Sequence, residues 1–254
     1  MAAGVKSVGA TLDVIDCVAN APEGASLAEI SAALELSKPS ILRHLSTLVD
    51  RGYLIRNALT LRYSLGPRLY VLGELAASSI DLLSLADPVM RKLRDEVGLT
   101  VNLATFGKTG VVIVKSILGI NATEVRVRIG AEFPFHATSQ GRVALAFSRQ
   151  DLMPAVREVG LVRFTEHTIT DFDELAADVA RVRDQGWCMA SEETRIGINA
   201  LSAPVFDRTG ECIAAITLVG LTHNLKGEPD PTHISALTAF AAQLTKQLGG
   251  TAQR

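Results

Sequence analysis

Cysteine is scarce in this chain of 254 residues: there are three, Cys17, Cys188 and Cys212, far apart in the sequence. An odd number of widely spaced cysteines excludes a disulfide framework, and there is no CxxC pair to bind a metal or carry thiol redox chemistry. The five histidines also lack the short spacings of a zinc site. We therefore predict that the cysteines are buried small apolar residues. We expect no metal and no other cofactor.

Long apolar runs are missing as well. A membrane-spanning helix needs a run of about 18 apolar residues, and none occurs. The first ten residues lack the charged-then-apolar pattern of a secretory signal. These absences predict a cytoplasmic protein with no membrane partner. With 48% hydrophobic and 20% charged residues, the composition excludes disorder and collagen, and leaves a globular chain of one or two domains.

Charge of one sign is not in excess: 25 basic and 27 acidic residues give a net charge of −2. Such an average argues against nucleic-acid binding, because phosphate neutralisation needs surplus cations. The charge is unevenly distributed, however. Residues 1–36 carry a net charge of −4, and residues 37–68 carry six basic residues and one acidic residue. The segment 37–68 therefore has the surplus of cations that the whole chain lacks.

The first 66 residues have the pattern of three short helices followed by a β-hairpin. Apolar side chains recur at three- and four-residue spacing near the start, which predicts a helix with one face turned to a core. That face is formed by Val8, Leu12, Ile15 and Val18. Ser26 and Glu29 form a capping-box pattern that starts a second helix. After a tight turn, Ser37 can cap a third.

The third predicted helix has a polar face opposite its apolar stripe. The stripe is formed by Ile41, Leu45, Leu48 and Val49. The opposite side chains have the lengths and hydrogen-bonding groups that contact base edges and phosphates. The predicted DNA contacts of this helix are Lys38, Ser40, Arg43, His44 and Thr47.

A basic hairpin follows this helix. Two short strands flank a four-residue turn, Asn57 to Thr60, and we expect Arg56 and Arg62 at the tip. A short helix, a tight turn, a helix with a polar face and a basic hairpin together predict a winged helix-turn-helix that binds double-stranded operator DNA. The alternative is a three-helix head whose basic face is only solvated.

The rest of the chain predicts an α+β fold around an antiparallel sheet. A linker helix is expected over 68–79, within a linker of 67–83, and the second domain over 84–254. The predicted strands are Leu99–Phe106, Val111–Ile117, Thr123–Ile129, Trp187–Ser191, Asn199–Phe206 and Cys212–Val219. The predicted helices are Ser84–Val97, Ser139–Phe147, Asp151–Val156, Pro231–Leu248 and one that a capping-box pattern at Thr170–Asp173 opens. An antiparallel sheet of this kind leaves one face available for a ligand site.

The order and spacing of several motifs resemble those of the IclR family of bacterial transcriptional regulators, over nearly the full length. Besides the head, they are Phe135–Arg142, Thr168–Asp171, Gly186-Trp187 with Glu192-Glu193, and Gly197 with Ser202–Asp207. The resemblance implies a winged helix-turn-helix domain at 1–66 and a GAF-like effector-binding domain at 84–254. It also implies a small organic effector, a homodimer or a dimer of dimers, and control of metabolic operons.

The resemblance implies an effector site at Ser139, Gln140, Ala190, Ala200, Thr217 and Val219. Members that bind small 2-oxo acids such as glyoxylate hold the carboxylate with backbone amides at the first two positions. They have polar side chains at the other four, of which this chain keeps only Thr217. Each missing partner penalises a small polar ligand by roughly 1–3 kcal/mol. We therefore expect a larger and more apolar effector, such as an aromatic acid; the alternative is a core that has filled in and binds nothing.

A small-molecule-processing enzyme with an appended helical interaction head is the second hypothesis. Glu192 and Glu193 resemble a carboxylate pair, but adjacent strand residues point to opposite faces and cannot flank one substrate. A solvated loop or a structural salt bridge explains them better. Cys188 or Cys212 beside His136 would suggest a thiol nucleophile, yet no third, orienting residue is identifiable. We therefore predict no catalytic residue and no enzymatic activity.

Overall fold

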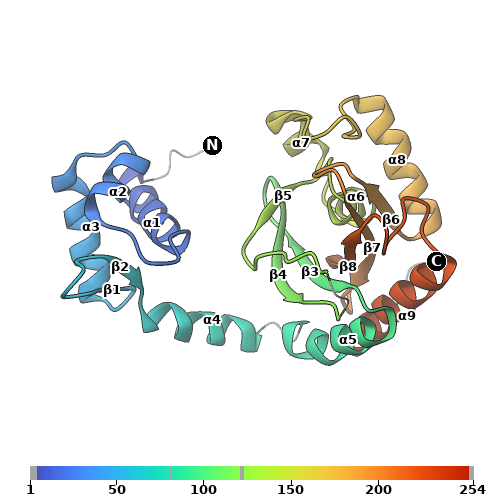
Figure 1. The fold of residues 1–254 in the computed structure, drawn as a ribbon, viewed down its shortest axis with the longest axis horizontal. Coiled ribbons are helices and arrows are strands. Elements are labelled where there is room, and N and C mark those ends of the chain that lie inside the picture. The colour runs from blue at the N-terminus through green and yellow to red at the C-terminus, as the bar shows by residue number, and fades with distance from the viewer. Residues whose placement is uncertain (1–4, 80–81, 121–122, 252–254) are drawn as a thin grey trace. The chain divides into compact units, whose positions relative to one another are not determined.

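The computed structural model describes residues 5–79, 82–120 and 123–251 (Figure 1). The chain divides into two compact units, residues 1–80 and 81–254. Within the described ranges, no helix is long and apolar enough to cross a membrane.

The first unit is a helical head with a two-stranded wing. Its elements are α1 (Lys6–Ala19), α2 (Leu27–Ala33), α3 (Lys38–Asp50), β1 (Leu54–Arg56), β2 (Tyr63–Leu65) and α4 (Pro67–Ser79). The capping box at the start of α2 is confirmed: the Glu29 amide donates to Ser26 Oγ at 3.3 Å, and the Ser26 amide donates to Glu29 Oε2 at 2.7 Å. The core of the head comprises Val14, Val18, Ile30, Ile41, Leu45, Leu48, Leu54 and Tyr63.

The predicted inward face of the first helix is partly wrong. Val8 and Leu12 are each 56% exposed, whereas Val14 and Val18 are buried. The side of α1 that meets α2 and α3 is therefore rotated away from the apolar stripe, and it includes polar Thr11, which hydrogen-bonds His44 of α3. The direction of the core is set by the neighbouring helices and cannot be found from the spacing within α1 alone.

The second unit is built on a six-stranded antiparallel sheet with the strand order β5-β4-β3-β8-β7-β6. The strands are β3 (Thr100–Phe106), β4 (Gly110–Ile117), β5 (Glu132–Pro134), β6 (Cys188–Ser191), β7 (Ile198–Phe206) and β8 (Cys212–Leu221). The α+β class is thereby confirmed. The register is continuous across the centre of the sheet, where Asn102 of β3 pairs with Thr217 of β8 and Thr217 pairs with Ser202 of β7.

Helices cover both faces of this sheet (Figure 1). On one face, α5 (Leu82–Val97) and α9 (Pro231–Gln247) share the largest apolar cluster with the inward residues of β3, β7 and β8. On the other face lie α6 (Ser139–Phe147), α7 (Met153–Val159) and α8 (Phe172–Gln185). The face under α6 also carries the polar residues Asn102, Thr217 and Ser202, which positions the candidate site.

Two predictions for this unit are wrong. Residues 123–129 form no strand, because the free edge of β4 pairs instead with residues 130–134; Val111, for example, pairs with Phe133. The cap of α8 is Asp171 rather than Thr170: its Oδ1 accepts from the amides of Asp173 and Glu174, each at 2.9 Å. One carboxylate thus satisfies two first-turn amides, so Thr170 has no capping role.

Candidate functional site

The outward face of α3 is the candidate nucleic-acid surface of the head. Lys38, Arg43 and Thr47 are exposed, as predicted, and Ser40 is only half-buried. His44 instead turns inward, where its Nδ1 lies 2.8 Å from Thr11 Oγ1. The most outward positions include two that the sequence reasoning missed, Leu42 and Ser46. A helical wheel centred on Arg43 would have found them, since Ser46 and Leu42 lie on one side of that residue, about 60° and 100° around the helix at 3.6 residues per turn.

The turn before α3 fixes the direction of this helix. Glu35 adopts a left-handed conformation, with φ of +52°. Across the turn, Ser31 Oγ donates to the Leu36 carbonyl at 2.6 Å, and the Leu36 amide donates to the Ser31 carbonyl at 3.3 Å. Ser37 occupies the N-cap position but makes no side-chain cap hydrogen bond. A free N-cap hydroxyl at an exposed helix start is available to a phosphate.

The wing places its two arginines differently. Arg56 is exposed, with its guanidinium 5.8 Å from the centre of the Tyr63 ring. Arg62 does not lie at the tip: its Nε donates to the Gly24 carbonyl at 2.9 Å, and its Nη2 donates to Glu29 at 2.8 Å. The tip itself carries Leu59, which is 94% exposed. Arg62 therefore ties the wing to α2.

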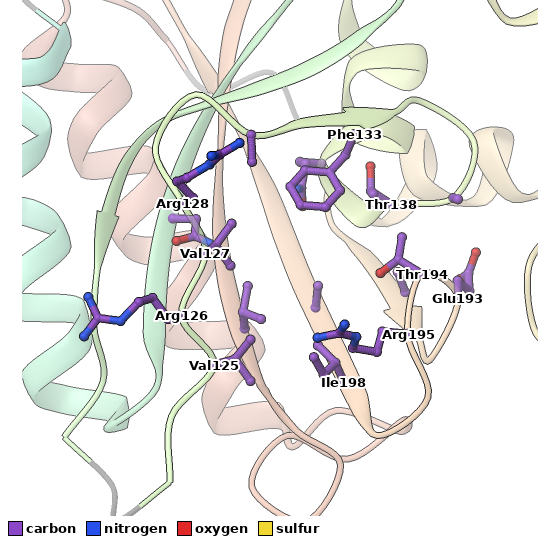
Figure 2. A pocket seen from close by; sticks show the side chains of 17 residues that line it. Val125, Arg126, Val127, Arg128, Phe133, Thr138, Glu193, Thr194, Arg195 and Ile198 are labelled. Atoms are coloured by element: carbon purple, nitrogen blue, oxygen red, sulfur yellow. The ribbon is translucent and has the colours of Figure 1, made fainter. Parts of the chain in front are cut away.

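The second unit contains a cavity of about 360 Å³ on the sheet face beneath α6 (Figure 2). Its walls are residues 125–133, the start of α6 and the loop 193–198, and its floor is formed by strands β3, β6, β7 and β8. The lining includes four of the six predicted effector positions: Gln140, Ala190, Ala200 and Val219. The segment that was expected to be a strand thus contributes Val125 and Val127 to the cavity lining, and this part of the unit is not filled by side chains.

Three of these positions form one row across the floor. Ala190 of β6 pairs with Ala200 of β7, and Ala200 pairs with Val219 of β8. None of these side chains has a hydrogen-bonding group. This part of the floor is therefore apolar. Its side chains are short, which leaves room above them for a bulky apolar group.

The two remaining predicted positions, Ser139 and Thr217, do not line the cavity with their side chains. Their hydroxyls are joined through Ser202, which the sequence reasoning missed: Ser139 Oγ lies 2.6 Å from Ser202 Oγ, and Ser202 Oγ lies 2.8 Å from Thr217 Oγ1. All three residues are fully buried. This hydroxyl chain of Ser139, Ser202 and Thr217 anchors the first turn of α6 to the sheet.

The first turn of α6 begins beside the cavity, whose lining includes Thr138 and Gln140. Thr138 is the N-cap, and its Oγ1 accepts from the Gly141 amide at 3.1 Å. The amides of Ser139 and Gln140 precede any possible i−4 acceptor in the helix, so they remain available to an anion. Gly141 allows this turn to pack closely, because a Cβ there would lie 2.2 Å from the Phe135 carbonyl oxygen.

A buried ion pair supports the loop 193–198. Arg142 Nη1 and Nη2 donate to the two carboxylate oxygens of Glu193, at 2.8 and 2.6 Å, and Asp178 lies 3.1 Å from Arg142 Nε. Arg142 is 1% exposed. Burial raises the pKa of Glu193, while Arg142 opposes that rise. The hypothesis that Glu193 forms a structural salt bridge is confirmed.

Cations dominate the charges around the cavity. Arg126, Arg128 and Arg195 belong to the lining, and its one carboxylate, Glu193, is bound by Arg142. Figure 2 shows Arg128 and Arg195 on opposite sides of the cavity, whereas Arg126 points away from it. The surplus of positive charge favours an anionic ligand.

The residues considered for catalysis are inert in this structure. Burial raises the pKa of Cys188 to about 11 and that of Cys212 to about 12, so both thiols are protonated and weakly nucleophilic at neutral pH. His136 is buried with Nε2 3.0 Å from the Val162 carbonyl oxygen, and burial lowers its pKa. Among the described residues, no group of three or more His, Cys, Asp or Glu could hold a metal ion.

Comparison with known families matches both units. The family "IclR helix-turn-helix domain" matches residues 7–58, and "Bacterial transcriptional regulator IclR C-terminal" matches residues 74–246. The chain belongs to the IclR family. It is a DNA-binding transcriptional regulator of the kind that responds to a small molecule, and it is not an enzyme.

Sequence similarity to other members of the IclR family extends over almost the whole chain. The regulator XynR of Escherichia coli (strain K12) is 31% identical over 96% of this chain and 98% of its own length. The Pca regulon regulatory protein of Pseudomonas putida is 29% identical over 96% of this chain and 84% of its own length. An IclR transcriptional regulator from Alicyclobacillus acidocaldarius has a crystal structure that superposes with a TM-score of 0.85, at 26% identity, over 98% of this chain and 100% of that one.

Proposed function

We propose that this IclR-family regulator binds operator DNA through its head, and that an organic acid in the cavity beneath α6 controls that binding. The regulated genes are those of a metabolic, catabolic operon. The proposal assigns the head to residues 1–66, the linker helix to 67–83 and effector binding to 84–254. An enzymatic role is set aside, since the chain belongs to a family of regulators.

The apolar row Ala190–Ala200–Val219 carries the assignment of the effector. Available first-turn amides of α6 and nearby arginines suit a carboxylate, while the row offers no partner to a second polar group. A ligand as small as glyoxylate would leave most of a cavity of about 360 Å³ unfilled. The effector is therefore an acid with an apolar body, such as an aromatic acid.

On the DNA side, the proposal gives base and phosphate contacts to Lys38, Arg43 and Thr47, with Leu42 and Ser46 beside them. Arg56 reaches the backbone from the wing. Ser40 and His44 lie at the inward margin of the helix, and Arg62 acts through the wing's attachment to α2. Two heads in a homodimer, or four in a dimer of dimers, would place their α3 helices in successive major grooves of a pseudo-palindromic site.

Exposed apolar residues on the head suit such an assembly. Tyr70 and Val71 of α4 are 71% and 47% exposed, and Val8 and Leu12 of α1 are exposed as well. Effector binding would change how paired heads are held, and so change operator affinity. Linkage requires the effector to prefer one arrangement over the other, typically by about 1–3 kcal/mol.

Calorimetric titration of the purified chain tests the proposed effector class. We expect measurable binding of benzoate or phenylacetate, and weaker binding of glyoxylate and pyruvate. The double substitution A190D and A200C adds polar groups to the row and should shift the preference toward glyoxylate. Tight binding of glyoxylate alone by the unmodified chain would overturn the assignment.

A further inference from the structure

Asn102 occupies the floor of the cavity and has no partner for its side chain. It lies in β3, is 1% exposed and belongs to the cavity lining. Neither its Nδ2 nor its Oδ1 makes a hydrogen bond within the described part of the chain. This residue is not among the effector positions that the family resemblance implied.

The neighbouring polar groups on the same face are already engaged. Thr217, the register partner of Asn102 on β8, is held in the hydroxyl chain by Ser202 at 2.8 Å. Thr100, two residues before Asn102 on β3, has its Oγ1 3.1 Å from Glu124 Oε2 and accepts from the Gly119 amide. Asn102 therefore stands out as the polar group of this part of the floor that these contacts leave unsatisfied.

Packing does not explain an asparagine at this position. Asparagine is disfavoured in strands, and a buried amide without hydrogen-bond partners lowers the stability of the fold. A leucine of nearly the same size would avoid both penalties. A residue that breaks a local rule without a structural gain marks a functional position.

The carboxamide also defines what it can recognise. It offers one donor group and one acceptor side by side, which a hydroxyl can match because it both donates and accepts. A carboxylate only accepts, so it could bind Nδ2 of Asn102 but would leave Oδ1 without a donor. We propose that Asn102 binds a hydroxyl of the effector, whose carboxylate lies at the first turn of α6, and that the effector is therefore a hydroxy acid. This inference rests on the proposed function.

Matched pairs of acids test the inference by calorimetry on the full chain. The probes are benzoate with the 2-, 3- and 4-hydroxybenzoates, phenylacetate with 4-hydroxyphenylacetate, and hexanoate with 6-hydroxyhexanoate. We expect at least one hydroxy acid to bind the unmodified chain about tenfold or more tightly than its parent acid. In N102L that ratio should fall to about one.

Asn199 provides a control for folding, because it is also an asparagine, is as buried as Asn102 and lies on a strand of the same sheet. Its Nδ2 donates to the Leu225 carbonyl at 2.8 Å, and its Oδ1 accepts from the Glu192 amide at 3.0 Å. N199L should lower the melting temperature, whereas N102L should leave it unchanged or raise it. A fall on N102L as large as that on N199L would show that Asn102 serves the fold, and would contradict the inference.

The outcomes separate the two proposals. Parent acids that bind as tightly as every hydroxy acid would overturn the role of Asn102 and leave the proposed effector site intact. A hydroxyl preference that survives in N102L would also overturn it. If no acid of the panel binds, the proposed function itself fails, and the inference fails with it.

Discussion

Arg142 of α6 holds Glu193, in the loop after β6, by two hydrogen bonds of 2.8 and 2.6 Å between buried groups. Glu193 also lines the cavity, and Thr194 and Arg195 follow it in the lining. The pair therefore fixes the loop that forms one wall of the site to the helix whose amides form another. A rigid wall of this kind holds ligand-binding groups in place before the ligand arrives.

Removing the arginine of this pair should be strongly destabilising. R142M would leave Glu193 buried without its counter-ion and would leave Asp178 with Arg181 alone, for which we expect a loss of about 3–5 kcal/mol in the free energy of unfolding. Denaturation in urea measures it. R149M is the control, since Arg149 pairs with Glu211 at an exposed site and its loss should cost less than about 1 kcal/mol. Equal effects of the two substitutions would contradict the structural role assigned to Arg142.

The two arginines Arg43 and Arg62 should differ in what their removal does. Arg43 is exposed on α3, so R43A should weaken binding to upstream DNA by about 1–3 kcal/mol, with a smaller salt dependence. Arg62 is bound to Glu29 and the Gly24 carbonyl, so R62A should mainly lower the melting temperature of the head. Gel shifts at several salt concentrations and thermal melts make the comparison. A larger loss of DNA affinity in R62A than in R43A would reverse our assignment.

Asp87 gives the second unit a defined sensitivity to acid. Hydrogen bonds from Arg91 and from Lys115 of β4 lower the pKa of Asp87 from its ordinary value of 3.8 to about 2. The stabilisation is therefore complete above pH 3.8 and is lost as the pH falls toward 2. D87N should lose up to about 1 kcal/mol at pH 7, because the site is partly exposed, and should show a flatter stability curve between these pH values. An unchanged slope in D87N, measured by urea denaturation across that range, would refute the assignment.

Gly141 should tolerate no side chain. In G141A the new Cβ would meet the Phe135 carbonyl oxygen at 2.2 Å, so the first turn of α6 must shift and its amides would move away from the cavity. We expect a destabilisation of about 1–3 kcal/mol and loss of acid binding in calorimetry. Gly9 of α1 has nothing within 4 Å of an added Cβ, and G9A should instead stabilise by about 0.5–1 kcal/mol. Wild-type acid binding by G141A would contradict the role of this turn.

Much of the fold follows from signals that are local in the sequence. The capping box of Ser26 and Glu29, the helix Ser139–Phe147 and the turn before α3 are each specified by residues within a few positions of one another. The family motifs located the cavity, because Gln140, Ala190 and Ala200 all line it.

The features that could not be predicted depend on partners distant in the sequence. The hydroxyl of Thr217 is hydrogen-bonded to Ser202, and the guanidinium of Arg62 is bound to Glu29. The spacing of residues along the chain does not reveal these contacts. Residues 123–129 have the composition of a strand, but the edge of β4 pairs with residues 130–134 instead. A role for Asn102 could not be predicted for the same reason. It depends on the absence of a hydrogen-bond partner among the described residues, and that absence is visible only when the contacts of the surrounding residues are known.

The most direct test of the account is operator binding measured by fluorescence anisotropy with and without an aromatic acid. The unmodified chain is compared with two variants. A200L places a larger side chain in the cavity floor. M189L is the control, because Met189 lies on the adjacent strand β6 and does not line the cavity. We predict that the acid changes the operator Kd of the unmodified chain and of M189L by about 5- to 150-fold. In A200L the operator Kd without acid should be unchanged and the response lost. A response in A200L equal to that of the unmodified chain would contradict the account.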